Sequence, residues 1–136
     1  MVKGYTGGVF DILHEGHLNL IRRARELCDY LVVGVQDDSE VIKLKAKPIL
    51  NTEERFRQIK ALGIADEVII YYDGTKPDHL KRIKPDIFVH GEDWIKQTDR
   101  SEVIKYMKEN NIELKLLPRT EGISTSDIKE RIKNGI

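Results

Sequence analysis

The chain has 136 residues, of which 40% are hydrophobic, and its 23 basic and 23 acidic side chains give a formal net charge of zero. This length suits one domain, over residues 1–136, with a single core, and the apolar runs are too short for a membrane-spanning helix. The balanced charge argues against bulk electrostatic binding of nucleic acid.

Strand and helix patterns alternate along the chain. Strand patterns are found at residues 2–8, 30–35, 67–71, 86–90 and 112–117, and the run at 30–35 is continuously apolar, as expected of a strand covered on both faces. Apolar residues spaced by three and four predict helices at residues 16–28, 52–62, 77–83, 100–109 and 124–133. A short helical turn at residues 39–42 leads into a basic loop at 43–50. Asn51 or Thr52 can cap the second of these helices, and Asp99 or Ser101 the fourth.

This alternation predicts an α/β fold: a Rossmann-like, doubly wound, five-stranded parallel sheet with helices on both faces. In such sheets, ligands bind outside the carboxyl ends of the strands, where the strand order reverses. Three unusual segments follow predicted strands one, four and five, at residues 7–17, 90–94 and 119–126. We therefore expect these three segments to meet at one edge of the sheet.

Two further features of the sequence concern the cellular compartment of the protein. The first residues lack the pattern of a secretory signal peptide, because strand-like residues begin at once. Cys28 is the single cysteine, which excludes an intrachain disulfide, and its position predicts a core residue on the first helix. We expect a cytoplasmic protein that does not insert into a membrane.

The segment from Gly7 to His17 carries the strongest chemical signal. Gly8 lets the backbone turn tightly beside a ligand, and Gly16 leaves room at the start of a helix whose N–H groups favour an anion. His14 and His17 can donate hydrogen bonds to phosphoryl oxygens and stabilise charge that develops during a displacement. This spacing favours a phosphate site over two surface histidines beside a turn.

The basic loop offers a second set of candidates. Lys43, Lys45 and Lys47 can close over phosphates, and Arg55 on the following helix can join them. The alternative is a solvated loop. We expect Lys43 to contact phosphate, whereas both interpretations stay open for the other two lysines.

Residues 90–94 contain the only tryptophan of the chain, Trp94. This residue is either a core anchor or the wall of a base pocket, in which Asp93 would accept hydrogen bonds from an exocyclic amine or from ribose hydroxyls. The histidines and carboxylates nearby match no tetrahedral zinc spacing, so we expect no residue to serve as a dedicated metal ligand.

The last segment places Arg119 at the end of a strand, before a glycine turn and the Ser-Thr-Ser start of a helix. Ser124 and Asp127 suit an ordinary capping box. A helix N-terminus with hydroxyls, beside an arginine, is also a cradle for phosphate, and the two roles are compatible.

Together these segments resemble the cytidylyltransferase family of nucleotidyltransferases. The resemblance covers nearly the whole chain and rests on two motifs, Gly8-x-Phe10-Asp11-x-x-His14-x-Gly16-His17 and Arg119-Thr120-Glu121-Gly122-Ile123-Ser124-Thr125. The second motif points to CTP. The short length and the run Gly91-Glu92-Asp93-Trp94 are most similar to the glycerol-3-phosphate cytidylyltransferases.

The resemblance implies transfer of CMP from CTP to a small phosphate monoester with release of pyrophosphate, and glycerol 3-phosphate, giving CDP-glycerol, is the first candidate. It also implies a homodimer and Mg²⁺ bound mainly through the nucleotide phosphates. Gly63 stands where the glycerol-3-phosphate enzymes carry an arginine. Ethanolamine phosphate, choline phosphate and phosphonates therefore stay open as acceptors, as do an adenylyltransferase of the same fold making FAD or an ADP-sugar and a nucleotide-binding module without catalysis.

The resemblance also assigns roles to residues. His14, His17, Lys43 and Arg119 would take part in catalysis, and Asp11 would position the phosphates or help to hold Mg²⁺. Contacts to the nucleotide would come from Gly8, Phe10, Asp11, Gly16, Lys45, Arg55, Asp93, Trp94, Thr120, Ser124 and Thr125. Because a phosphate monoester is largely dianionic at neutral pH, the chain would mainly align the reactants and stabilise charge.

Overall fold

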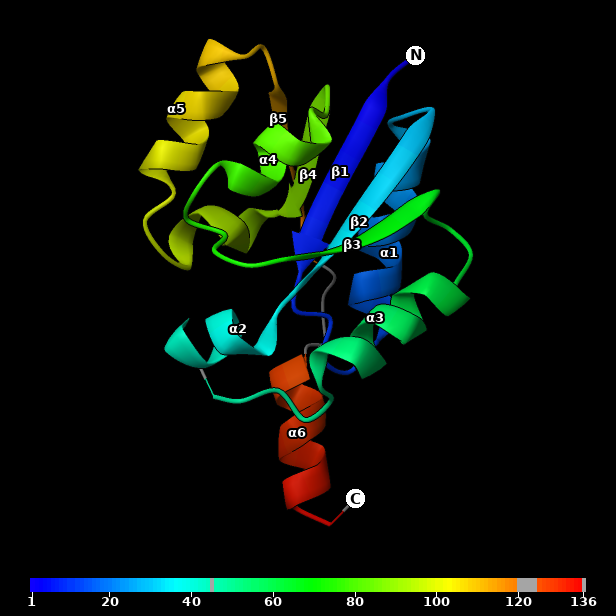
Figure 1. The fold of residues 1–136 in the computed structure, drawn as a ribbon. Coiled ribbons are helices and arrows are strands. Elements are labelled where there is room, and N and C mark those ends of the chain that lie inside the picture. The colour runs from blue at the N-terminus through cyan, green and yellow to red at the C-terminus, as the bar shows by residue number, and fades with distance from the viewer. Residues whose placement is uncertain (45, 120–124, 136) are drawn as a thin grey trace.

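The computed structural model describes all residues except 45, 120–124 and 136 (Figure 1). Five parallel strands form one sheet in the order β3-β2-β1-β4-β5. Their bounds are β1 Lys3–Gly8, β2 Tyr30–Gln36, β3 Glu67–Tyr71, β4 Ile87–Gly91 and β5 Glu113–Leu117. The predicted doubly wound parallel sheet is confirmed, and each predicted strand agrees with the structure to within one residue at either end.

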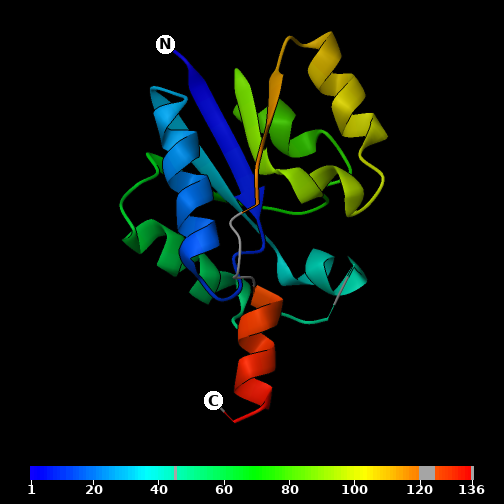
Figure 2. The ribbon, with the colours of Figure 1, turned by 180° about the vertical axis from the view of Figure 1, so that it is seen from behind.

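Helices cover both faces of this sheet. Their bounds are α1 Glu15–Glu26, α2 Asp38–Leu44, α3 Thr52–Ala61, α4 Asp78–Ile83, the 3₁₀ helix η1 Glu92–Lys96, α5 Ser101–Glu109 and α6 Thr125–Lys133. Figures 1 and 2 show α1 and α3 on one face, α4 and α5 on the other, and α6 beyond the end of the sheet. No helix among the described residues is long and apolar enough to cross a bilayer.

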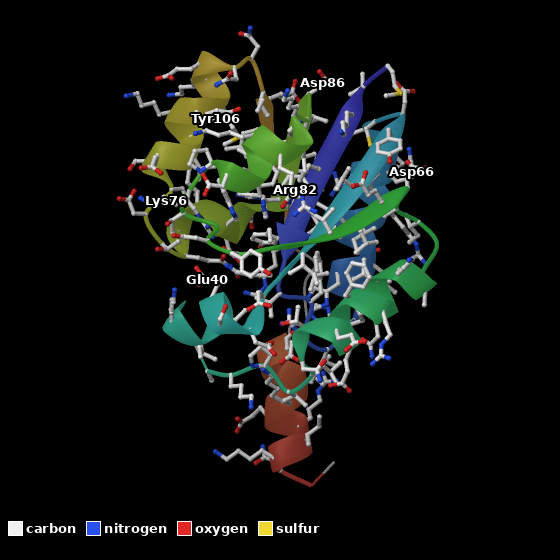
Figure 3. All side chains as sticks on the ribbon, viewed as in Figure 1. Glu40, Asp66, Lys76, Arg82, Asp86 and Tyr106 are labelled. Atoms are coloured by element: carbon white, nitrogen blue, oxygen red, sulfur yellow. The ribbon has the colours of Figure 1, made fainter. Side chains whose placement is uncertain are left out.

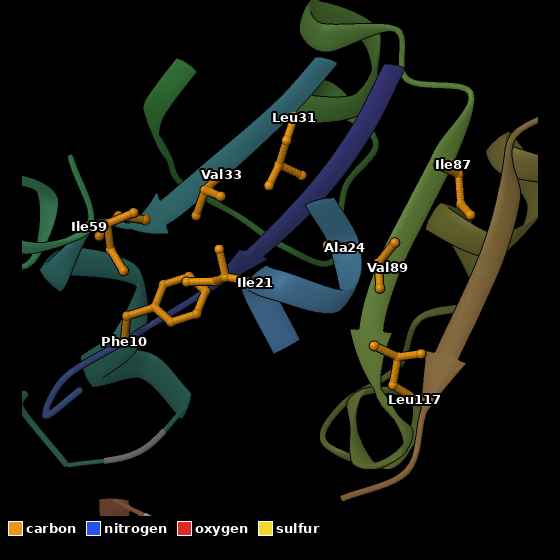
Figure 4. Close-up of a cluster of buried hydrophobic side chains, with 10 residues drawn as sticks. Phe10, Ile21, Ala24, Leu31, Val33, Ile59, Ile87, Val89 and Leu117 are labelled. Atoms are coloured by element: carbon orange, nitrogen blue, oxygen red, sulfur yellow. The ribbon is translucent and has the colours of Figure 1, made fainter. Parts of the chain in front are cut away.

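Each face of the sheet has its own cluster of buried side chains. Under α1 and α3, Ile21, Val33 and Ile59 belong to one cluster, and Cys28 packs against it as predicted (Figure 4). Under α4 and α5, the second cluster includes Tyr5, Leu80, Phe88 and Met107. Burial on both faces explains why the central strand β2 is a nearly continuous apolar run in the sequence.

Local hydrogen bonds set the starts of two helices. Asn51 caps α3 through a reciprocal pair of bonds with Glu54, as predicted. At the start of α5, Arg100 occupies the N-cap position and its side chain makes no cap bond. Asp99, one of the two predicted caps, lies one residue earlier, and its carboxylate accepts from the backbone N–H of Ser101 at 2.9 Å.

The amino edge of the sheet is held by aspartates. Asp66 accepts from the backbone N–H of Leu31 and from Arg25, and Asp86 accepts from the backbone N–H of Lys3 (Figure 3). The bond from Leu31 holds the pKa of Asp66 below its usual value. These carboxylates hold the amino ends of the strands in place. The loops that could form a binding site are at the opposite, carboxyl edge of the sheet. At that edge the strand order reverses between β1 and β4.

A buried histidine packs against the second cluster. Nδ1 of His79 is 2.8 Å from the hydroxyl of Tyr5, and within the described part of the chain its Nε2 has no hydrogen-bond partner. Burial, reinforced by the positive charge of Arg100, lowers the pKa of His79 to about 4. The imidazole is therefore neutral in the folded protein at neutral pH.

We expect the folded state to lose stability as pH falls from about 6.5 to about 4. In that window the unfolded chain protonates His79 whereas the folded chain does not, and the pKa difference corresponds to roughly 3 kcal/mol at most. Urea unfolding at pH 7 and pH 4.5 measures the loss. His79→Gln should lose less stability on acidification than the wild type, and an equal loss would contradict this origin.

Candidate active site

A cleft of about 760 Å³ opens at the carboxyl edge of the sheet. Such a volume suits a small-molecule ligand. The predicted residues that line it are Gly8, Phe10, Asp11, His14, Gly16, His17, Asp93, Trp94, Arg119 and Thr125. They come from the end of β1 and the loop after it, from the start of α1, from η1, from the segment after β5 and from α6. The described parts of the three segments that we expected to meet at one edge therefore do meet there.

His14 and His17 form a stacked pair at the start of α1. Their ring centroids are 3.8 Å apart with an interplanar angle of 22°. His14 is the N-cap of α1: its Nδ1 accepts from the backbone N–H of Gly16 at 3.0 Å, and its own backbone N–H donates to Nδ1 of His17 at 3.4 Å. Backbone bonds thus fix the orientation of both rings.

These bonds also fix where a neutral ring carries its proton. Because Nδ1 of each imidazole accepts a backbone hydrogen bond, the ring proton resides on Nε2. Both side chains line the cleft, so His14 and His17 offer two Nε2–H donors beside the positive end of the α1 dipole. This arrangement suits phosphoryl oxygens.

Phe10 packs against His17 of this pair from inside the fold. Its ring is 3% exposed and meets His17 edge-on, with 5.5 Å between centroids and a 76° interplanar angle. Its φ of 52° is in the left-handed region, which costs a bulky residue energy and bends the chain sharply after β1. A side chain on Gly8 would approach the Phe10 ring at 3.3 Å. Phe10 therefore packs beneath the site, and because it also lines the cleft, its nucleotide contact stays a prediction.

Asp11 ties three segments together. Its carboxylate, 3% exposed, accepts from the backbone N–H groups of Ile49 and Leu50 at 3.0 and 2.9 Å and from Nζ of Lys129 at 2.7 Å. Burial raises its pKa, but the bonds from Leu50 and Lys129 outweigh burial and leave that pKa below its usual value. Asp11 thus anchors the loop before α3 and docks α6 at the cleft.

The expected phosphate contact of Arg55 is wrong. The side chain is fully buried and does not line the cleft. Its guanidinium donates to the carbonyl oxygens of Val9, Gln36 and Leu50 and to Asp38 and Thr52. All five N–H groups are therefore used inside the fold. Arg55 joins the ends of β1 and β2 to α2 and α3.

The structure does not bring Lys43 into the cleft. Helix α2 extends beyond the predicted turn and includes Lys43, whose side chain is 68% exposed and pairs with Glu40 at 2.7 Å. That bond raises the pKa of the Lys43 ammonium. The Glu40 side chain is only 13% exposed and lies on the side of α2 that faces the rest of the molecule in Figure 3. A catalytic role for Lys43 stays a prediction, and Lys45 lies outside the described residues.

Trp94 packs as a core anchor at the border of the cleft. It is 6% exposed, stacks on His90 with 4.7 Å between centroids, and meets the Phe88 ring edge-on. Asp93 is exposed on η1, a 3₁₀ helix where the sequence suggested a loop. The described residues contain no group of three or more His, Cys, Asp or Glu side chains that could hold a metal.

Several residues of the cleft were missed by the sequence predictions. Lys129 is one turn past Thr125 on α6, and this spacing of four could have identified it. Arg23 lines the cleft from α1, and a further group lines it from β2, β3, η1 and α5: Gln36, Tyr71, Gln97 and Arg100. Thr120 and Ser124, which we expected to contact the nucleotide, lie outside the described residues.

The chain matches a family model described as cytidylyltransferase-like over residues 5–131. It is 38% identical over 133 residues to an ethanolamine-phosphate cytidylyltransferase of Dictyostelium discoideum, covering 96% of this chain and 36% of that protein. It is 40% identical to the bifunctional protein HldE of Campylobacter concisus (strain 13826), covering 96% of this chain and 27% of that protein. The chain thus spans about a third of these relatives or less.

Solved structures give the same fold. A lipopolysaccharide core biosynthesis protein from Thermoplasma volcanium GSS1 superposes with a TM-score of 0.75 at 29% identity, covering 90% of this chain and 99% of that one. A pantothenate synthetase from Thermus thermophilus superposes with a TM-score of 0.65 at 17% identity, covering 98% of this chain and 64% of that one, which shows a likeness of fold alone.

Proposed function

The chain belongs to the cytidylyltransferase-like family of nucleotidyltransferase enzymes, and from this membership we propose that it transfers CMP from CTP to a small phosphate monoester, releasing pyrophosphate. The observation that carries the proposal is the stacked His14–His17 pair at the N-terminus of α1, lining a cleft where the strand order reverses. The ethanolamine-phosphate cytidylyltransferase relative supports CTP as the nucleotide.

In the proposed reaction an oxygen of the acceptor phosphate attacks the α-phosphorus of CTP. The bond from that phosphorus to the bridging oxygen breaks, and pyrophosphate leaves with the electron pair. The acceptor is already ionised near neutral pH, because the second pKa of a phosphate monoester is about 6. The Nε2–H groups of His14 and His17 would donate to the α-phosphoryl oxygens, whose negative charge grows in the transition state.

The triphosphate would bind on the side of the cleft formed by α1, the end of β5 and α6. Arg23 and Arg119 bring positive charge to that side, Lys129 adds an ammonium that is paired with Asp11, and Thr125 adds a hydroxyl. The Asp11 oxygens already accept three chain donors. A Mg²⁺ ion would therefore be held mainly by the nucleotide phosphates, where it would neutralise part of their charge.

Two acceptors lead the proposal. Glycerol 3-phosphate follows from the sequence pattern, whereas the Dictyostelium relative supports ethanolamine phosphate. Gly63 has a φ of +69° just after α3, where an arginine would be strained. The arginine of the glycerol-3-phosphate pattern is thus replaced by a helix-ending glycine. A homodimer remains a prediction from the resemblance, which light scattering would measure.

The experiment is a pyrophosphate-release assay of the purified chain with CTP and a panel of acceptors: glycerol 3-phosphate, ethanolamine phosphate, choline phosphate and a phosphonate. Release that requires both CTP and one acceptor supports the proposal. Binding of CTP without release from any acceptor would instead favour a non-catalytic nucleotide-binding module.

Replacing Arg119 by Ala should chiefly raise the KM for CTP, by roughly tenfold or more, because a charged hydrogen-bond donor to the triphosphate is lost. Arg119 lines the cleft just beyond β5. Arg57→Ala serves as the control. Arg57 is exposed on α3, and its ion pair with Glu53, at 3.9 Å, is on the surface. An unchanged KM for CTP in Arg119→Ala would refute the triphosphate role.

A further inference from the structure

Positive charge is unevenly distributed around the cleft. Arg23, Arg119 and Lys129, together with the histidine pair, line it from α1, β5 and α6. Among the described lysines and arginines that line it, Arg100 alone comes from the opposite side, where η1 and α5 begin. Figures 1 and 2 show η1 and the start of α5 across the end of β1 from α1.

Arg100 is buried among neutral hydrogen-bond acceptors. It is 9% exposed, and its guanidinium carbon lies 4.6 Å from the centroid of the Trp94 ring. Nε and Nη1 donate at 3.1 Å to the carbonyl oxygens of Trp94 and Gly74, and Nη2 donates to Gln97 at 3.3 Å. Of the five N–H groups of an arginine, these three bonds leave one on each terminal nitrogen.

In the described part of the chain, no carboxylate lies within 4.0 Å of Arg100; Asp73 acts on it only from farther away. Arg55 is a useful comparison, because it is more deeply buried than Arg100 and is paired with Asp38. A buried guanidinium without a counter-ion is costly. An anion that enters the cleft would offset the cost of burying the Arg100 charge. It would not do so for Arg55, which does not line the cleft and already has Asp38 as its counter-ion.

Glu92 and Asp93 of η1 also line this side of the cleft, but the immediate neighbours of the Arg100 guanidinium are neutral. Burial holds the pKa of His90, next to Trp94, well below its usual value, so Arg100 is the cation there. Gly74 leaves space beside the guanidinium. A Cβ at this position would lie 3.3 Å from Nη1 of Arg100. The exposed carboxylates of η1, Glu92 and Asp93, do not pair with Arg100.

We propose that Arg100 binds the phosphate of the acceptor and holds it on the η1 side of the cleft, facing the nucleotide bound beside His14 and His17. This assignment rests on the proposed function. A triphosphate, with its several charges, matches the cations on the α1, β5 and α6 side. A phosphate monoester carries fewer charges and can be bound by one guanidinium. The two remaining N–H groups of Arg100 can donate to two phosphate oxygens, which is the bidentate geometry in which arginine binds phosphate.

The kinetic test compares two charge-neutralising changes, one at the N-cap of α5 and one on α5 itself. Arg100→Gln should raise the KM for the acceptor at least about tenfold while the KM for CTP stays within about twofold. Lys105→Gln, the control, removes the same charge from α5 at a side chain that is 78% exposed and pairs with Glu109, and should change neither. An unchanged acceptor KM in Arg100→Gln, or a raised KM for CTP alone, would overturn the assignment.

A binding test does not depend on turnover. Trp94 is the only tryptophan and touches Arg100, so its fluorescence reports on this side of the cleft. Titration with inorganic phosphate or glycerol 3-phosphate, without CTP, should give a saturable change in the wild type and in Lys105→Gln. Arg100→Gln should abolish it, and Arg100→Lys should weaken it, because charge remains but the fork is lost.

No saturable response in the wild type, or one that saturating CTP removes, would overturn the assignment. If Arg100→Gln fails to fold by far-UV circular dichroism, these two wild-type outcomes still decide. If the enzyme assay fails with every acceptor while the Arg100-dependent titration succeeds, the transferase proposal falls and the anion site stands.

Discussion

Replacing His14 or His17 by alanine is expected to lower kcat by at least about a hundredfold. Each substitution removes one Nε2–H donor whose direction is fixed by a backbone bond to Nδ1. Loss of a single preorganised donor to a developing oxyanion costs about that much in other enzymes. Steady-state kinetics with saturating CTP and acceptor measure the effect.

His14→Asn separates catalysis from folding. His14 also caps α1, and a lost cap costs about 1 kcal/mol. Asparagine is a favoured cap residue, so this variant should keep the helix start and the urea midpoint while kcat falls as in His14→Ala. Activity close to that of the wild type in a stably folded His14→Asn would remove the histidine pair from the mechanism.

Arg55→Met is expected to destabilise the fold by about 3–5 kcal/mol. The change leaves Asp38 without its partner and the carbonyl oxygens of Val9, Gln36 and Leu50 without donors, and breaking one side of a buried pair is costly. Urea unfolding at neutral pH measures the loss. Arg57→Met, two residues along α3 and 66% exposed, should stay within about 0.5 kcal/mol of the wild type.

This variant also decides between two interpretations of Arg55. A phosphate ligand would leave stability nearly intact and raise the KM for CTP. A stable Arg55→Met protein with a raised KM would therefore support the expectation from the sequence and contradict the network of five hydrogen bonds.

The sequence predicted the framework well because its signals are local. Apolar runs, the Asn51 cap and glycine turns depend on neighbours along the chain, and with parallel strands they imply which loops share an edge. Residues 7–17 and 90–94 and Arg119 were therefore placed correctly around one cleft, although nothing in the sequence shows how the two imidazoles stack.

The misassigned residues depend on distant partners. Arg55 follows a lysine-rich loop, and the sequence does not reveal that three carbonyl oxygens from separate segments converge on it. The ion pair of Asp11 with Lys129 was also not predicted, because Lys129 is near the other end of the chain; the role of Asp11 toward phosphate or Mg²⁺ stays a prediction. Arg100 gave no signal at all, since a single arginine before a helix usually faces solvent.

The central claim is most directly tested by ³¹P NMR of reactions that contain one nucleotide and one acceptor, run with CTP and ATP side by side. With CTP we predict paired diphosphate signals of a CDP-linked product, equal in amount to the pyrophosphate released, and none when His14 is replaced. Product with ATP but not with CTP, or no product from any acceptor despite saturable CTP binding, would contradict the assignment of a cytidylyltransferase.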